Sequence, residues 1–283
     1  MKVGLIGLGA MGAGMADNLA KAGLLSAIYN RTEQKAKDLS CQLNIPFFKS
    51  AEELARHVNI ILLCISADND VLEIVKTITP SLQAHSIVVD MSTVSKETAI
   101  KAAVILASKQ VEFLDAPVSG GVEGAKNGTL SVMVGGDETA LETVRPALEA
   151  ISSRIVHMGP VGSGQSTKAV NQIMAAGINQ AVTEALAFGQ DQGLNMDKVI
   201  EVVSGGAAGN WFLQHRGASM TNKTFEPGFK LALHHKDLKI CQNMAKQTST
   251  ALNLTDKTIL DYEELMKQGR GDDDISALYL LKQ

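Results

Sequence analysis

Short apolar runs alternate with amphipathic segments over the first 160 or so residues of the chain. The runs have the length of buried strands, and the segments between them show helical spacing. The predicted strands are Lys2–Ile6, Leu25–Tyr29, Asn59–Ile65, Ser86–Asp90, Val111–Asp115 and Leu130–Val134, and the clearest helices are Met11–Lys21, Ala51–His57 and Lys96–Lys109. Continuous apolar strands separated by helices predict an α/β fold with a doubly wound parallel sheet, covered on both faces.

The pattern changes after Gly164. Apolar residues then recur at helical spacing from Ala169 to Phe188, which predicts a single helix of about 25 residues. Further helices are expected over Met196–Val203, Asp237–Ala245 and Thr255–Lys267, and we expect no strand after about residue 158. The sequence therefore predicts two domains, 1–162 and 163–283, the second all-helical and joined to the first by the long helix. The length and apolar character of that helix favour a homodimer or homotetramer formed through it and the second domain.

Composition narrows the possible functions. The chain has 283 residues, of which 45% are hydrophobic and 20% charged, with a formal net charge of −4. Such a chain can bury a core, and it has no general electrostatic attraction for nucleic acid or an anionic membrane. No apolar stretch approaches the ~20 residues that cross a bilayer, and the three scattered cysteines suggest no disulfide framework. We expect a soluble, cytoplasmic protein.

The segment Gly7–Gly12 (GLGAMG) fits the pattern GxGxxG directly after the first predicted strand and at the start of the first helix. Glycines there permit a tight turn and the close approach of a pyrophosphate, while the helix N-terminus offers free N–H groups to an anion. A purely structural turn is the alternative. The order strand, turn and helix favours a dinucleotide-binding domain of the Rossmann type.

The end of the second predicted strand bears on the choice of cofactor. An NAD-specific site would carry an acidic residue near this point, to bind the ribose 2′-OH. The chain has Asn30, Arg31 and Thr32 there instead. Arg31 offers a planar set of donors suited to a 2′-phosphate, so NADP is the expected cofactor and NAD a possible one. An ordinary solvated loop arginine is the alternative.

Two later segments carry candidate chemistry. Asp115–Gly121 (DAPVSGG) leaves a strand and enters a glycine-rich loop, whose backbone N–H groups are suited to binding a carboxylate. Lys168 and Asn171 are spaced i, i+3 at the start of the long helix and therefore share a face. Burial of that lysine would disfavour its charged form and suit it to acid–base chemistry. A packing loop and a surface lysine are the alternatives.

Three segments in this order, Gly7–Gly12, Asp115–Gly121 and Gly162–Gln172, resemble the β-hydroxyacid dehydrogenase family. Members of this family include 3-hydroxyisobutyrate dehydrogenase, tartronate semialdehyde reductase and the glyoxylate/succinic semialdehyde reductases. Phe229–Asp237 and Gly271–Ala277 also resemble family segments, so the resemblance spans nearly the whole chain.

The resemblance implies hydride transfer between NAD(P) and a small 3-hydroxy acid or its semialdehyde. Lys168 would be the general acid in reduction and the base in oxidation, Asn171 would orient it and the substrate, and Ser119, Gly120 and Gly121 would hold the substrate carboxylate. Residues expected at the cofactor are Gly7, Leu8, Gly9, Ala10, Met11, Gly12, Asn30, Arg31, Thr32, Ile65, Ser66, Thr93 and, from the second domain, Lys236. Ser66 stands where many relatives have proline, which leaves the shape of that loop open.

Other functions remain to be weighed. A catalytically silent dinucleotide-binding scaffold is the non-enzyme alternative, and the presence of Lys168, Asn171 and Lys236 argues against it. An NADPH-dependent glyoxylate/succinic semialdehyde reductase is the alternative within the family. We expect no metal site, because the only clustered ligand pair, His234 and His235, points in two directions. Whether Trp211 lines a substrate pocket or only packs is left open.

Overall fold

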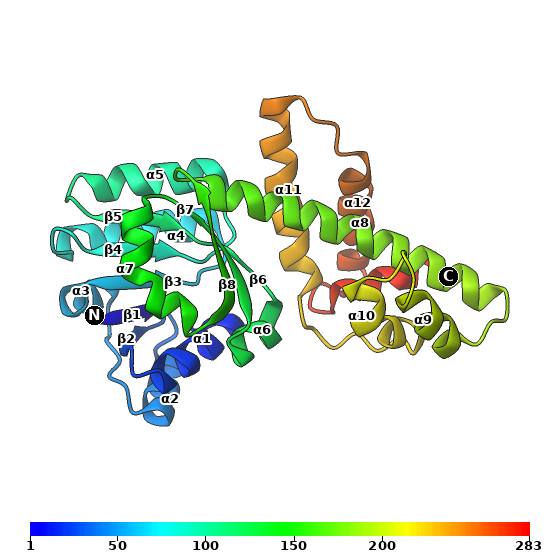
Figure 1. The fold of residues 1–283 in the computed structure, drawn as a ribbon, viewed down its shortest axis with the longest axis horizontal. Coiled ribbons are helices and arrows are strands. Elements are labelled where there is room, and N and C mark those ends of the chain that lie inside the picture. The colour runs from blue at the N-terminus through cyan, green and yellow to red at the C-terminus, as the bar shows by residue number, and fades with distance from the viewer. The chain divides into compact units, whose positions relative to one another are not determined.

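The computed structural model describes residues 1–283 and divides into two compact units, Met1–Lys168 and Ala169–Gln283 (Figure 1). The division falls inside one long helix, and each unit is described by itself below. The domain boundary expected from the sequence, between residues 162 and 163, remains a proposal.

The first unit consists of an eight-stranded sheet and the helices that cover it. Its strands are β1 (Val3–Ile6), β2 (Leu25–Tyr29), β3 (Ile60–Leu63), β4 (Ile87–Asp90), β5 (Glu112–Asp115), β6 (Val118–Ser119), β7 (Leu130–Gly135) and β8 (Ser152–Gly159). Its helices are α1 (Ala10–Lys21), α2 (Glu33–Leu43), α3 (Ala51–His57), α4 (Asp68–Ile78), the short η1 (Thr79–Ser81), α5 (Lys96–Ala107), α6 (Gly121–Asn127), α7 (Glu138–Glu149) and the start of α8 (Ser163–Asp191).

The strand order is β2-β1-β3-β4-β5-β7-β6, with β8 paired to β7. The parallel sheet that the sequence predicts is confirmed for β1 to β5. The expected strand over Leu130–Val134 differs, because β7 runs antiparallel to both β5 and β6. After β6 the chain passes through Gly120 and Gly121, both with positive φ, and through the helix α6, and β7 then returns alongside β6.

Alternate residues of the strands point to opposite faces of the sheet, and each face has its own core. Leu62 belongs to a core formed with α1, α2, α6 and α7, whereas its neighbour Leu63 belongs to one formed with α3, α4 and α5. Each fully buried leucine contributes roughly 1.5–3 kcal/mol of hydrophobic stabilisation. The two covered faces hold the strands in place, so that the loops at their carboxyl ends meet along one edge.

The second unit is helical. It comprises the rest of α8, then α9 (Met196–Ser204), α10 (Trp211–Thr221), α11 (Leu231–Thr248), α12 (Asn253–Lys267) and the C-terminal 3₁₀ segment η2 (Ile275–Lys282). Two small apolar clusters hold it together, and Tyr262 and Tyr279 are fully buried in them. Helix α10 was not expected from the sequence. It begins at Asn210, whose side chain accepts a hydrogen bond from the Leu213 N–H at 2.9 Å.

The long helix α8 has 29 residues, close to the length expected. Its faces are arranged differently from what the apolar pattern suggests. Val170, Met174 and Phe188 are exposed, whereas Gln165, Gln172 and Asn179 are buried. The polar side chains face the protein because they find hydrogen-bond partners there. No helix combines the length and hydropathy needed to span a membrane.

Candidate active site

The turn between β1 and α1 has the geometry of a phosphate-binding turn. Gly7 has a φ of +98°, and a Cβ there would lie 2.2 Å from the Cys64 carbonyl oxygen. A Cβ on Gly12 would lie 2.0 Å from the Gly7 carbonyl oxygen. Gly9 is different, because a Cβ there would meet no atom within 4 Å. Two glycines are therefore required by the fold, and the third leaves space open above the turn.

The N-terminus of α1 suits an anion. Gly9 is the N-cap, no side chain caps the helix, and its first turn contains no acidic residue. Its first N–H groups and its dipole therefore attract negative charge. The strand order reverses between β1 and β3, which is where doubly wound sheets bind their ligands. The open space at Gly9 and this uncapped helix fit the pyrophosphate of a dinucleotide.

Asn30, at the end of β2, supports the turn from the side. Its Oδ1 accepts a hydrogen bond from the Leu8 N–H at 2.9 Å, and its Nδ2 donates to the Thr32 carbonyl at 3.1 Å. Arg31 is exposed, and its Nη1 lies 3.7 Å from Oδ1 of Asp70 in the first turn of α4. The sequence suggested that no carboxylate lies near the place of a 2′-phosphate. Asp70 corrects this, because α4 brings a distant acidic residue to Arg31.

The loops after β3 and β4 are joined directly. The Ser92 Oγ accepts a hydrogen bond from the Ile65 N–H at 2.9 Å, and the Ser92 N–H donates to Asp90 Oδ1 at 3.0 Å. These bonds bring the expected cofactor residues Ile65 and Thr93 to neighbouring loops at the carboxyl edge of the sheet. Ser66 follows Ile65 and is exposed.

Two fully buried carboxyl groups end β4 and β5 and lie in register, Asp90 beside Asp115. Burial raises the pKa of Asp90 to about 7, opposed by the hydrogen bonds from Ser92. Burial also raises the pKa of Asp115, and backbone N–H groups of Gly162 and Gln165 oppose that shift. Burial raises the pKa of the Cys64 thiol to about 12, so this cysteine is a packed thiol.

The predicted substrate turn leaves the sheet four residues after Asp115. Ser119 lies in β6, and Gly120 and Gly121 follow with φ values of +128° and +62°. Only glycine adopts two such conformations in succession without strain. The loop is thus a turn whose two positive-φ positions require glycine, and backbone N–H groups in a turn are able to bind an anion.

Lys168 lies at the end of the first unit, one turn into α8. It is 7% exposed and is the only buried residue among the chain's 26 lysines and arginines. Asn171 follows three residues later on the same helix, at the start of the second unit. Helical geometry places the two side chains on one face of α8.

In the second unit, Asn171 and Lys236 belong to one chain of polar contacts. Asn171 Nδ2 donates to Gln172 Oε1 at 2.8 Å, and Gln172 Nε2 donates to Asp237 Oδ2 at 2.6 Å. Lys236 Nζ pairs with Asp237 Oδ1 at 2.9 Å. Gln172 and Asp237 are buried, so they fix both residues that the sequence assigned to the site.

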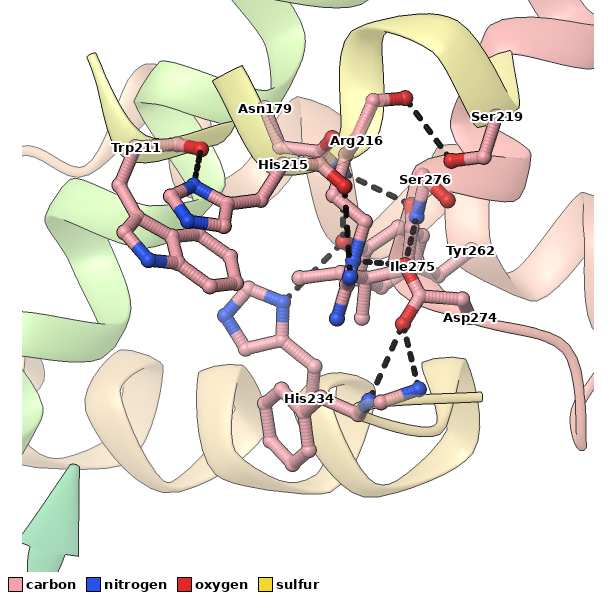
Figure 2. Close-up of polar contacts among 12 residues, drawn as sticks. Asn179, Trp211, His215, Arg216, Ser219, His234, Tyr262, Asp274, Ile275 and Ser276 are labelled. Carbon is pink, nitrogen blue, oxygen red and sulfur yellow. Dashed lines mark hydrogen bonds and ion pairs between the residues drawn. The ribbon is translucent and has the colours of Figure 1, made fainter. Parts of the chain in front are cut away.

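Several residues considered in the sequence have structural places. His234 is fully buried, with Nδ1 3.1 Å from the Tyr262 hydroxyl (Figure 2). Its Nε2 lies 3.2 Å from the Gln172 carbonyl, so His234 is a core histidine. Trp211 is half-exposed and stacks on His215 at 4.4 Å between ring centroids (Figure 2). Asp274 is buried and accepts hydrogen bonds from the Gly228 and Phe229 N–H groups. No group of three histidine, cysteine or acidic residues lies close enough to hold a metal ion.

Sequence comparisons agree with this geometry. Residues 2–159 match the family model described as the NAD binding domain of 6-phosphogluconate dehydrogenase. Residues 162–281 match the model described as NAD-binding of NADP-dependent 3-hydroxyisobutyrate dehydrogenase. The chain belongs to the β-hydroxyacid dehydrogenase family.

The similarity to known proteins extends over most of the length of both chains. An uncharacterized oxidoreductase of Shewanella frigidimarina is 38% identical over 276 residues, which cover 96% of this chain and 95% of the relative. The 2-hydroxy-3-oxopropionate reductase of Escherichia coli is 38% identical over 257 residues, covering 90% and 87%. The solved structure of Mycobacterium tuberculosis 3-hydroxyisobutyrate dehydrogenase with L-serine has a TM-score of 0.90 at 29% identity, covering 99% and 98%. This β-hydroxyacid dehydrogenase is thus an NAD(P)-dependent oxidoreductase, and the scaffold alternative falls away.

The sequence reasoning missed the residues that support the site, namely Asp70, Asp90, Gln165, Gln172 and Asp237. One signal was available for two of them. Gln165, Lys168 and Gln172 recur at intervals of three and four, which places them on one helix face. Polar residues at helical spacing usually indicate a solvent-exposed face of the helix, and only the tertiary fold shows that this face is turned toward the protein.

Proposed function

We propose that this β-hydroxyacid dehydrogenase interconverts a small 3-hydroxy acid and its semialdehyde, as 3-hydroxyisobutyrate dehydrogenase does, with Lys168 as the general acid and base. The observation that carries the proposal is the burial of Lys168, alone among the lysines and arginines, one turn into a helix that begins against the ends of β5 and β7. Burial of an ammonium group costs free energy unless partners satisfy it, and a buried titratable group near strand ends is therefore a candidate for a functional site.

The bound dinucleotide supplies the hydride in reduction and accepts it in oxidation. Lys168 Nζ gives a proton to the carbonyl oxygen of the semialdehyde in reduction and takes the hydroxyl proton in oxidation. Asn171, oriented by Gln172, directs the substrate oxygen and Lys168. The N–H groups at Ser119, Gly120 and Gly121 hold the substrate carboxylate, and Lys236 contacts the cofactor.

The substrate class follows from what the named relatives share. Both 2-hydroxy-3-oxopropionate and L-serine carry a carboxylate with an aldehyde or hydroxyl on the third carbon. The turn at Gly120 and Gly121 is suited to such a carboxylate. A glyoxylate/succinic semialdehyde reductase is the second proposal, and the exposed Arg31 at the end of β2 favours it because NADPH dependence goes with that activity.

NADPH is the proposed preferred cofactor, with NADH as a weaker one. Arg31 is exposed and its guanidinium is open to a 2′-phosphate through charge-assisted hydrogen bonds. Asp70 pairs with Arg31 at 3.7 Å and would repel that phosphate. We therefore infer a smaller preference for NADPH than Arg31 alone would give.

The assembly and the location of the protein are also proposed. Val170, Met174 and Phe188 leave apolar area exposed along α8, which supports a homodimer or homotetramer formed through the long helix and the second domain. The proposed location is the cytoplasm, and no nucleic acid or membrane partner is proposed. The mass of the purified protein in light scattering tests the oligomer.

An activity panel tests the function. Methylmalonate, malonic, tartronate and succinic semialdehydes and glyoxylate are each reduced with NADPH and with NADH, and kcat/KM is compared. The proposal expects the highest kcat/KM with a three-carbon-chain semialdehyde acid and NADPH. A higher value for succinic semialdehyde or glyoxylate would favour the second proposal, and no oxidation of NADPH with any of them would contradict both.

A further inference from the structure

The first turn of α8 is held by a carboxylate at the end of a strand of the sheet. Asp115, at the end of β5, accepts the Gly162 N–H through Oδ1 at 2.7 Å and the Gln165 N–H through Oδ2 at 2.8 Å. A helix leaves its first N–H groups without partners inside the helix. One buried carboxylate satisfies two of them, and its charge faces the positive end of the helix dipole.

Gln165 ties the same turn to a second strand end. Its Nε2 donates to the Ser92 carbonyl at 2.9 Å, and its Oε1 accepts the Val94 N–H at 3.2 Å. The side chain is 1% exposed. Ser92 and Val94 flank Thr93 in the loop after β4, and Ser92 also binds the Ile65 N–H. The amide of Gln165 thus joins the helix directly to the loop after β4, and through Ser92 to the loop after β3.

The backbone leaves the helix little room to shift. A Cβ on Gly164 would lie 2.3 Å from the Met133 carbonyl oxygen and 2.5 Å from that of Asp115. A Cβ on Gly135 would lie 2.9 Å from the Gly164 nitrogen. Helix α8 therefore begins in direct backbone contact with the ends of β5 and β7.

We propose that Gln165 is a positioning residue, which together with Asp115 fixes Lys168 relative to the loop Ser92–Val94. Lys168 follows Gln165 by three residues and shares its helix face. The inference rests on the proposed function, which gives Lys168 its role. Proton transfer requires hydrogen-bond reach, and a displacement of about 1 Å costs up to ~10²-fold in rate. A helix start held only by its own backbone allows such displacements.

Replacement of the amide tests this role. Gln165→Met keeps the length of the side chain and removes both hydrogen bonds to the loop. We expect kcat for the semialdehyde to fall roughly 10–100-fold. The Kd of NADPH, measured by fluorescence without turnover, stays within about threefold because the phosphate turn is untouched. Ser166→Ala is the matched control, since the Ser166 hydroxyl donates only to the Gly162 carbonyl of its own helix among the bonds described. It keeps wild-type kcat.

A double-mutant cycle separates positioning from a general loss of structure. In the Lys168→Ala background, Gln165→Met causes no further loss of kcat, because no lysine remains to be positioned. Losses that multiply, or a Gln165→Met enzyme with wild-type kcat, overturn the inference and leave the proposed function standing. A Lys168→Ala enzyme with wild-type kcat overturns the proposed role of Lys168 as the general acid, on which the inference rests. Gln165→Glu, which keeps the acceptor for Val94 and loses the donor to Ser92, carries the same cycle if Gln165→Met does not fold.

Discussion

The substitution Gly9→Ala distinguishes the contribution of the glycine turn to folding from its contribution to cofactor binding. Gly9 has φ −71° and ψ −171°, a conformation open to alanine, and a Cβ there meets no protein atom within 4 Å. The change replaces a glycine N-cap with alanine, which costs about 1 kcal/mol. For a chain of this size that lowers Tm by roughly 2–4 °C.

The same methyl group enters the space where a pyrophosphate would approach. Overpacking by one methyl costs about 1–3 kcal/mol, so Gly9→Ala is expected to weaken NADPH binding by roughly 5–150-fold. Titration of NADPH fluorescence gives the Kd, and circular dichroism gives Tm. Gly12→Ala is the contrasting variant. Its Cβ would lie 2.0 Å from the Gly7 carbonyl oxygen, so we expect Tm to fall and NADPH binding to be lost in the same variant.

A matched control comes from the second unit. A Cβ on Gly205, at the end of α9, would lie 3.7 Å from the Val202 carbonyl oxygen, an ordinary contact. Gly205→Ala should change neither Tm nor the Kd of NADPH appreciably. If Gly9→Ala binds NADPH as tightly as wild type, the pyrophosphate does not lie over this turn and the reasoning is wrong.

Three further predictions concern pH, substrate and cofactor. Asp90 has a pKa of about 7 in the folded chain and about 3.9 in the unfolded chain. Its contribution to stability is therefore full below about pH 4, falls by about 1.4 kcal/mol per pH unit as pH rises from about 4 to about 7, and is lost above that. Urea unfolding should show this slope in wild type relative to Asp90→Asn, and parallel curves for the two would contradict it. An aldehyde without the carboxylate leaves the N–H groups at Gly120 and Gly121 unpaired at a cost of about 1–3 kcal/mol, roughly 5–150-fold in kcat/KM; equal kcat/KM values would remove that role from the turn. Arg31→Ala should raise KM for NADPH and not for NADH. Asp70→Asn should strengthen the NADPH preference roughly 1.5–5-fold. Equal effects on both cofactors would refute the assignment of Arg31 to the 2′-phosphate.

The sequence predicts those parts of the fold that depend on neighbours along the chain. The strand–helix–strand segment from Val3 to Tyr29, with its glycine turn, was predicted from the order of apolar runs and the helical spacing between them, and the structure agrees. Helix α8 shows the limit of this reasoning. Periodicity marks which residues are polar but not what they contact, so it did not show that Met174 is exposed and Gln172 is buried.

The supporting residues of the site depend on contacts that only the tertiary fold creates. Asp115 and Gly162 are 47 residues apart, and Gln172 and Asp237 are 65 apart. No spacing along the chain predicts such pairs. The antiparallel direction of β7 was missed for a similar reason, because it follows from the path of the chain through Gly120, Gly121 and α6 and not from the apolar pattern of the strand.

The rate of the reaction in Lys168→Ala tests the central claim most directly. Single-turnover oxidation of NADPH at 340 nm is followed with methylmalonate semialdehyde, and the Kd of NADPH is measured in parallel. A positioned proton donor contributes roughly 10²–10⁴-fold to the rate, so the variant should lose that factor while it binds NADPH as wild type does. A variant that turns over at close to the wild-type rate would show that Lys168 is a buried structural lysine and not the general acid.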